Sequence, residues 1–136
     1  MFDGSYGKIA TTVCETRSAQ FSPQSHQELF DAVASCLQMS AVGDCSRGAH
    51  GPIGDWDVSA ITDMHSLFYR ATVFNADISR WDVSAVTSMT DMFDEASSFD
   101  IDISRWDVSA VDDMTDMFYR SSSFKQVLCV GLLGWH

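Results

Sequence analysis

The sequence has few basic residues and no hydrophobic run long enough to cross a membrane. Eight Lys and Arg residues stand against nineteen Asp and Glu residues, which gives a formal net charge of −11. Phosphate groups attract basic side chains, so this balance argues against nucleic acid and anionic membrane surfaces as partners. No apolar run approaches the roughly 20 residues that a membrane-spanning helix needs. The negative charge favours solubility and is compatible with cationic or metal partners.

The sequence also lacks the motifs of common enzymes and zinc sites. It contains no G-x-S-x-G, H-E-x-x-H, G-x-G-x-x-G or phosphate-binding loop. Its cysteines form no C-x-x-C pair and are not spaced with the four histidines as in a zinc site. Asp112 and Asp113 could in principle act as general acid and base, but charges at the start of a helix explain them more simply. We therefore expect a non-catalytic protein with no cofactor and no catalytic or metal site.

The four cysteines are Cys14, Cys36, Cys45 and Cys129. An even number permits two disulfides, and we favour Cys36–Cys45 because the loop between them is short. Free buried thiols in a reducing compartment are the alternative that the sequence leaves open. The N-terminal residues lack a basic stretch followed by an apolar one, so we expect a chain that is not secreted, already processed or a fragment.

The dominant feature of the sequence is a 25-residue repeat. The segment I-S-R-W-D-V-S-A-V occurs at 78–86 and again at 103–111, and the related I-G-D-W-D-V-S-A-I occurs at 53–61. Alignment on the tryptophans keeps the other apolar positions apolar in all three units. The residues predicted to form stacked structural columns are Trp56, Trp81 and Trp106; Val58, Val83 and Val108; Met64, Met89 and Met114; Phe68, Phe93 and Phe118; and Phe74, Phe99 and Phe124.

Each unit has the pattern of a short strand followed by a short helix. Apolar residues alternate in W-D-V-S, which favours a strand. They recur three and four positions apart in residues 86–96, which favours an amphipathic helix. One such unit cannot bury its own apolar side, but stacked copies can. The expected fold is therefore α/β, a short right-handed strand–helix solenoid of leucine-rich-repeat type, with parallel strands about 4.8 Å apart.

The remaining segments are expected to cover the ends of this solenoid. Ser25 and Glu28 form a capping-box pattern that predicts a helix before the repeats. After the third repeat the register breaks, and the apolar Leu132, Leu133 and Trp135 either fold over the last repeat as an irregular cap or contact a partner. The predicted division is an N-terminal extension at 1–21, a helical cap and connecting loop at 22–52, the repeats at 53–124, and a degenerate fourth repeat at 125–136.

Stacking would also align charged residues. The aspartates Asp57, Asp82 and Asp107 would lie one above another. Each carboxylate either accepts backbone N–H bonds in its own turn or shares a cation such as Ca²⁺ with its neighbours, although no calcium-loop motif is present. A second column alternates in sign, and we expect Arg70, Glu95 and Arg120 to form one line on the helical side.

The repeat is similar to the D-I-S-x-W-D-V-S-x-V-T-x-M-x-x-M-F repeat of the BspA-like leucine-rich-repeat surface proteins. These occur in mycoplasma-type lipoproteins, other bacterial surface proteins and unicellular algae. The similarity covers residues 53–124, and residues 28–64 resemble the helical cap of algal members. The resemblance implies a strand–helix solenoid with a role in surface attachment or protein interaction, an extracellular or cell-surface location, and no enzymatic activity.

Two function classes remain, and both are binding functions, with another protein as the expected partner and a glycan as an alternative for the first class. The first is a protein-interaction or surface-recognition module that uses an exposed face of the repeats. The second is a small accessory or structural subunit of a larger complex, for example in an algal organelle lumen or a photosynthetic assembly, attached through its terminal segments. Fold analogy supports the binding role but does not identify the partner.

Overall fold

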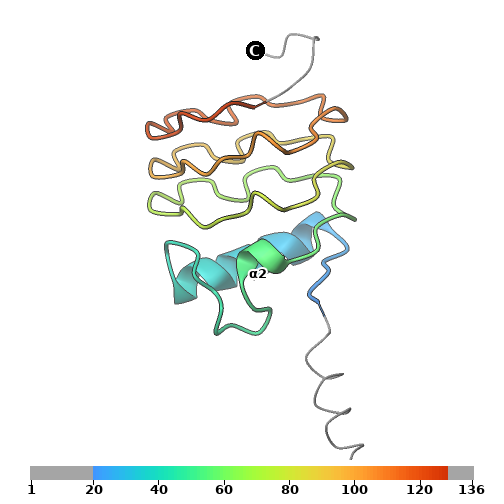
Figure 1. Cartoon of the computed structure of the whole chain (residues 1–136), viewed down its shortest axis with the longest axis vertical. Helices are drawn as coiled ribbons and strands as arrows, with labels where there is room; N and C mark the ends of the chain where they lie inside the picture. Colours follow the sequence, from blue (N-terminus) through green and yellow to red (C-terminus); the bar gives the residue numbers. More distant parts are fainter. Residues whose placement is uncertain (1–19, 129–136) are drawn as a thin grey trace, which may run out of the picture.

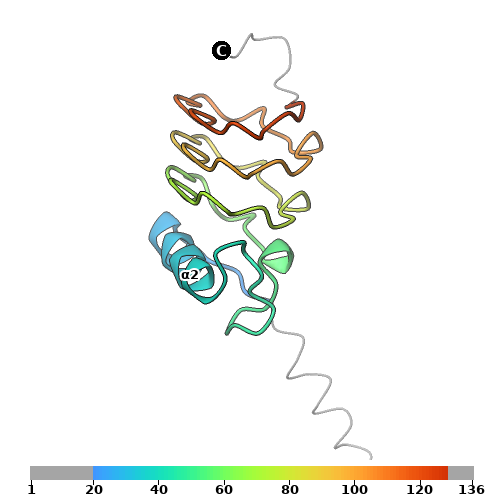
Figure 2. The same ribbon diagram turned by 90° about the vertical axis from the view of Figure 1, so that its left-hand side faces the viewer.

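The computed structural model describes residues 20–128 and shows three stacked coils above a helix. The helix α2 (His26–Met39) lies beneath the stack, and a connecting loop leads from it to the first coil (Figure 1). Coil 1 comprises residues 53–77 and begins with the short 3₁₀ helix η1 (Ile53–Asp55); coil 2 comprises 78–102 and coil 3 comprises 103–128. The turned view shows the coils lying nearly parallel to one another (Figure 2).

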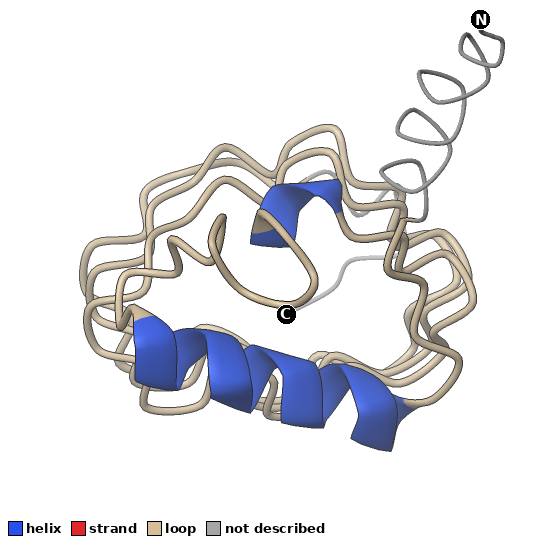
Figure 3. Cartoon of the chain, turned by 90° about the horizontal axis from the view of Figure 1, so that it is seen from below, coloured by secondary structure: helices blue, strands red, loops and turns tan. Residues whose placement is uncertain are grey.

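Helix α2 begins at the predicted cap. The Ser25 hydroxyl accepts a hydrogen bond from the Glu28 N–H at 3.1 Å, and the Glu28 carboxylate accepts one from the Gln24 N–H at 2.9 Å. These side chains satisfy N–H groups that have no acceptor within the helix. The helix buries one face, formed by Leu29, Ala32, Val33 and Cys36, against the open side of coil 1. Seen from below, α2 runs along one long side of the coils (Figure 3).

The predicted disulfide between Cys36 and Cys45 is present. Its Cα atoms are 5.4 Å apart, within the usual range for a disulfide, and both residues are buried. The bond joins the last turn of α2 to the connecting loop. Cys14 and Cys129 lie outside the described residues.

The predicted α/β strand–helix solenoid is wrong. Within residues 20–128 the coils contain no α-helix, and no sheet forms; the only strand-like contacts are two isolated parallel bridges, Asp63 with Ser88 and Ser88 with Asp113. The segment expected to be a helix at 86–96 is a series of turns. In each turn an N–H group donates to the carbonyl three residues earlier, for example from Ala96 to Phe93 at 3.0 Å.

Hydrogen bonds between coils explain why no helix forms. In coil 1, alternate N–H groups donate to carbonyls of coil 2, and coil 2 repeats the pattern with coil 3, at N···O distances of 2.7–3.0 Å. The coil 1 donors are Met64, Ser66, Phe68 and Arg70, and the coil 2 donors are Met89, Asp91, Phe93 and Glu95. An α-helix would use these groups within its own segment. The stack uses them between repeats instead.

This arrangement requires unusual backbone angles at two positions in every coil. Six residues have a positive φ between 53° and 60°, and they fall in three pairs that follow the 25-residue period: Ser66 and Arg70, Asp91 and Glu95, Asp116 and Arg120. Residues other than glycine rarely adopt this left-handed conformation. Its recurrence shows that the turns are built into the repeat.

The W-D-V-S segments are turns rather than the predicted strands. The carboxylates of Asp57, Asp82 and Asp107 each accept a hydrogen bond from the hydroxyl and from the N–H of the serine two residues later, at 2.6–3.0 Å. These contacts form the short polar turns that Asp favours. The side chains of Trp and Val in the same segments still point into the core.

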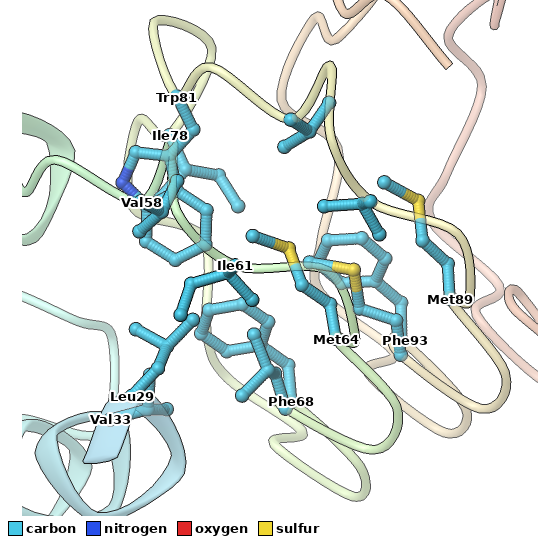
Figure 4. Packing of buried hydrophobic residues seen from close by; sticks show 14 of the residues in the cluster. Leu29, Val33, Val58, Ile61, Met64, Phe68, Ile78, Trp81, Met89 and Phe93 are labelled. Carbon is cyan, nitrogen blue, oxygen red and sulfur yellow. The ribbon is translucent and has the colours of Figure 1, made fainter. Parts of the chain in front are cut away.

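The core consists of the same side chains repeated from coil to coil. Figure 4 shows Met64 and Phe68 of coil 1 beside Met89 and Phe93 of coil 2, with Leu29 and Val33 of α2 below. The rings of Phe68, Phe93 and Phe118 stack with centroids 5.4 and 5.5 Å apart. A second stacked column, Phe74, Phe99 and Phe124, has spacings of 5.9 and 5.8 Å. Within each coil the two Phe rings are 4.1 Å apart.

The buried tryptophans of coils 2 and 3 each form a hydrogen bond with the preceding coil. The indole N–H of Trp81 donates to the Ile53 carbonyl at 2.8 Å, and that of Trp106 donates to the Ile78 carbonyl at 3.2 Å. A buried indole needs such a partner. In the small-residue column, Ser121 replaces Ala71 and Ala96, and its hydroxyl donates to the Phe93 carbonyl.

Candidate functional site

The most distinctive exposed feature is a line of tyrosine, arginine and acidic side chains on one edge of the stack. It arises from F-Y-R at 68–70, F-D-E at 93–95 and F-Y-R at 118–120. In each triplet the phenylalanine belongs to the aromatic column described above, and of the six residues that follow, all but the covered Asp94 are at least partly exposed. We call the six outer residues the tyrosine–arginine edge: Tyr69, Arg70, Asp94, Glu95, Tyr119 and Arg120.

The charged members of this edge form the predicted line. Arg70 Nε donates to one oxygen of Glu95 at 2.8 Å, and an Arg120 guanidinium nitrogen lies 3.3 Å from the other oxygen. These contacts confirm the 25-residue register, although the line runs along turns rather than along helices. Both arginine side chains are largely exposed and that of Glu95 is about a quarter exposed, so screening by water keeps the contribution of each ion pair to stability small.

The arginines also cover the exposed tyrosines. The Arg70 guanidinium carbon lies 5.1 Å from the centre of the Tyr69 ring, and that of Arg120 lies 5.0 Å from the centre of the Tyr119 ring. Cation–π contacts occur at such distances. Tyr69 and Tyr119 nevertheless remain 46% and 50% exposed. The edge therefore presents two large, half-exposed rings, each in contact with the arginine that follows it.

Asp94 lies between the two tyrosines in register and is covered by its surroundings. It is 9% exposed, whereas Tyr69 and Tyr119, the matching residues of the neighbouring coils, are about half exposed. Burial raises the pKa of the Asp94 carboxyl, and the negative charges of Asp91, Glu95 and Asp116 raise it further. The column thus alternates ring, carboxyl and ring.

An apolar groove adjoins the edge where coil 1 meets α2. Phe30 and Leu37 of the helix and Leu67 and Tyr69 of coil 1 are among its lining residues, and its volume is about 220 Å³. The Phe30 ring is partly exposed there. His26 and His65 connect helix and coil beside this region, with rings stacked 4.1 Å apart and His26 Nε2 2.9 Å from the His65 carbonyl oxygen. Tyr69 therefore belongs both to the edge and to the groove wall.

The repeated columns predicted from the sequence are the core of the stack rather than a surface. The Trp, Val, Met and Phe positions of coils 1 and 2 are almost fully buried, and Phe118 and Phe124 at the end of the stack are partly buried. Leu132, Leu133 and Trp135, which were predicted to contact a partner or cap the stack, lie outside the described residues. The tyrosines were not among the predicted site residues, although the duplicated F-Y-R triplet could have indicated them.

The stacked aspartates are engaged in their own turns. The hydroxyl and N–H of Ser84 lower the pKa of Asp82, while the charges of Asp57 and Asp107 oppose this effect. The corresponding serines lower the pKa of Asp57 and Asp107 in the same way. No cluster of three His, Cys, Asp or Glu side chains suited to a metal ion occurs in the part of the chain that the structure describes. The turn interpretation therefore accounts for this column.

A family profile described as "Mycoplasma protein of unknown function, DUF285" matches residues 37–130, more than half of the chain. The chain belongs to the DUF285 family. The matched region of this DUF285 protein starts in the last turn of α2 and includes all three coils with the complete tyrosine–arginine edge. No curated protein and no solved structure shows significant similarity to it. Among residues 20–128, no helix is both long and apolar enough to cross a bilayer.

Proposed function

We propose that this DUF285 protein is a non-catalytic protein-binding module whose contact surface is the tyrosine–arginine edge together with the adjoining groove. The observation that carries the proposal is the pair of half-exposed tyrosines, each covered by its own arginine. Tyr and Arg are enriched among the residues that contribute most to protein interfaces. An apolar groove beside a charged rim is also typical of such surfaces.

The stack supports this role because it holds the edge rigidly. The residues of the edge follow directly after the buried phenylalanines, and hydrogen bonds join Arg70 to Asp94 and Glu95 to Tyr119 through the backbone at 2.8 and 2.7 Å. Side chains held in place before binding lose less conformational entropy when a partner is bound. The resemblance to BspA-like surface proteins favours the same class of function by analogy.

The test starts from the protein isolated gently from its source, with its native mass and co-migrating proteins determined by mass spectrometry. We expect a stoichiometric partner, cross-linked mainly to residues of the edge. Replacement of Tyr69 and Tyr119 by Ala should release this partner. The control is Val42→Ala, which trims a half-exposed apolar side chain of the connecting loop, outside the edge and groove.

Two results would overturn the proposal. The first is a lone species near the chain mass of 15.0 kDa. The second is a partner that remains bound to the double tyrosine variant as tightly as to the unchanged protein. Cross-links confined to the terminal segments would instead support an accessory subunit held in a larger complex through those segments.

A further inference from the structure

Asp94 is a covered carboxyl group without a hydrogen-bond donor among the described residues. It is 9% exposed, yet within residues 20–128 no N–H or O–H group donates to its side chain. By contrast, the aspartates of the W-D-V-S turns each accept two hydrogen bonds. Burial of a charged group without a hydrogen-bond partner is unfavourable, so a donor supplied by another molecule would stabilise this carboxylate.

The charges around Asp94 favour a cationic donor. The negative charges of Asp91, Glu95 and Asp116 act on Asp94, and the two arginines of the edge are the opposing charges beside it. Four carboxylates and two guanidinium groups leave two negative charges in this patch. Both arginines are already engaged, because each contacts Glu95 and lies over its own tyrosine.

Tyr69 and Tyr119 occupy the positions in register with Asp94 in the two neighbouring coils. One lies a coil below Asp94 and the other a coil above it, as the backbone hydrogen bonds from Arg70 to Asp94 and from Glu95 to Tyr119 show. Tyrosine rings attract cations through their faces, and a carboxylate forms strong charge-assisted hydrogen bonds with ammonium and guanidinium groups. The three side chains together offer a basic group both kinds of contact.

We propose that Asp94, flanked by Tyr69 and Tyr119, receives a basic side chain, lysine or arginine, of the protein that binds the edge. This proposal rests on the proposed function and specifies the chemistry of the partner. Much of the desolvation of Asp94 has already occurred in the free protein, so the incoming cation gains a charge-assisted contact at reduced cost.

The test is an NMR titration of the whole isotope-labelled chain with small peptides of defined charge. The probes are acetyl-Gly-Lys-Gly-amide, the corresponding arginine peptide, and the lysine peptide with its side chain acetylated. We expect both basic peptides to shift the amide signals of Tyr69, Asp94 and Tyr119, and the acetylated peptide to leave them unchanged. Added salt should weaken the binding, since part of the attraction is between charges near the surface.

The deciding variant is Asp94→Asn, with Asp91→Asn as its matched control. Loss of the Asp94 charge should weaken binding of the basic peptides by about tenfold or more, the effect expected for a charge-assisted hydrogen bond. Loss of the neighbouring Asp91 charge should have a clearly smaller effect. Equal effects of the two variants, equal shifts with the acetylated peptide, or shifts spread over all acidic turns would overturn the proposal.

The same variants separate this proposal from the proposed function. If the natural partner is lost from the double tyrosine variant but retained undiminished by Asp94→Asn, the edge is a binding surface and the cation proposal is wrong. If the partner is retained by both, the proposed function itself is wrong. If both variants lose the partner and the peptide results agree, both proposals stand.

Discussion

Replacement of Phe93 by Ala tests whether the stacked aromatic columns hold the coils together. Phe93 is fully buried and stacks on Phe68, Phe99 and Phe118, at centroid distances of 5.4, 4.1 and 5.5 Å. Truncation of a buried Phe usually costs about 3–5 kcal/mol, because apolar contacts are lost and a cavity remains. Because Phe93→Ala removes the contacts with all three neighbouring rings, we expect a loss of stability in the upper half of this range.

Phe118 provides the comparison because it occupies the same column at the end of the stack. It is partly exposed, and its stacked partners are Phe93 and Phe124. We expect Phe118→Ala to cost about 2 kcal/mol, since part of the ring is already in contact with water. The two variants thus remove the same atoms from environments that differ in burial and in the number of stacked rings.

Urea unfolding monitored by tryptophan fluorescence measures both losses. The indole rings of all three coils are buried, so their emission reports on the whole stack. The free energy of unfolding should fall by at least about 1 kcal/mol more for Phe93→Ala than for Phe118→Ala, with similar denaturant slopes. Equal losses, or a larger loss at Phe118, would refute the idea that the columns act as continuous stacks.

Three further perturbations test other parts of the structure. Asp94→Asn should stabilise the free protein at neutral pH. Because the pKa of Asp94 is raised above 3.8 in the folded state, the stability that the protonated carboxyl provides is lost as pH rises through that pKa, and Asn carries no charge at any pH. A variant no more stable than the parent at pH 7 would contradict this. Replacement of Cys36 and Cys45 by Ser should lower the free energy of unfolding in urea by about 2–3 kcal/mol, the loop-closure value for their separation of 9 residues, and an unchanged free energy would argue against the disulfide. Asp116→Gly should raise the melting temperature and Asp116→Ile should lower it. The φ angle at this exposed position is 53°, which glycine adopts without steric cost and a β-branched residue does not. The reverse order of melting temperatures would argue against the left-handed turn.

The sequence predicts the register of this fold well because the register depends on side chains that recur exactly once per coil. Alignment on the tryptophans places Arg70, Glu95 and Arg120 in one line, as found. The Ser25 cap of α2 and the Cys36–Cys45 bond could also be predicted, since each depends on residues close together in the chain. These features need no knowledge of the path taken by the rest of the coil.

The local conformation within each coil could not be predicted in the same way. Apolar residues three and four positions apart suit an amphipathic helix, but successive turns place them on the buried side equally well. The choice between the two depends on whether the N–H groups of residues such as Phe68 and Phe93 find acceptors in the next coil, which is a long-range property. The same register places Tyr69, Asp94 and Tyr119 in one column, so the sequence could have indicated this part of the site, but the burial of Asp94 depends on how the coils pack.

The alternation of charge along the edge gives the stack a second, longer period. Backbone hydrogen bonds and core columns repeat with every coil, so a chain lacking residues 78–102 could join coil 1 directly to coil 3 with the same internal contacts. Arg70 would then face Arg120 with no carboxylate between them. In terms of geometry the unit of duplication is one coil, but in terms of charge it is two. Gain or loss of coils in pairs preserves the pairing of opposite charges along this edge, whereas a single loss creates a repulsion there.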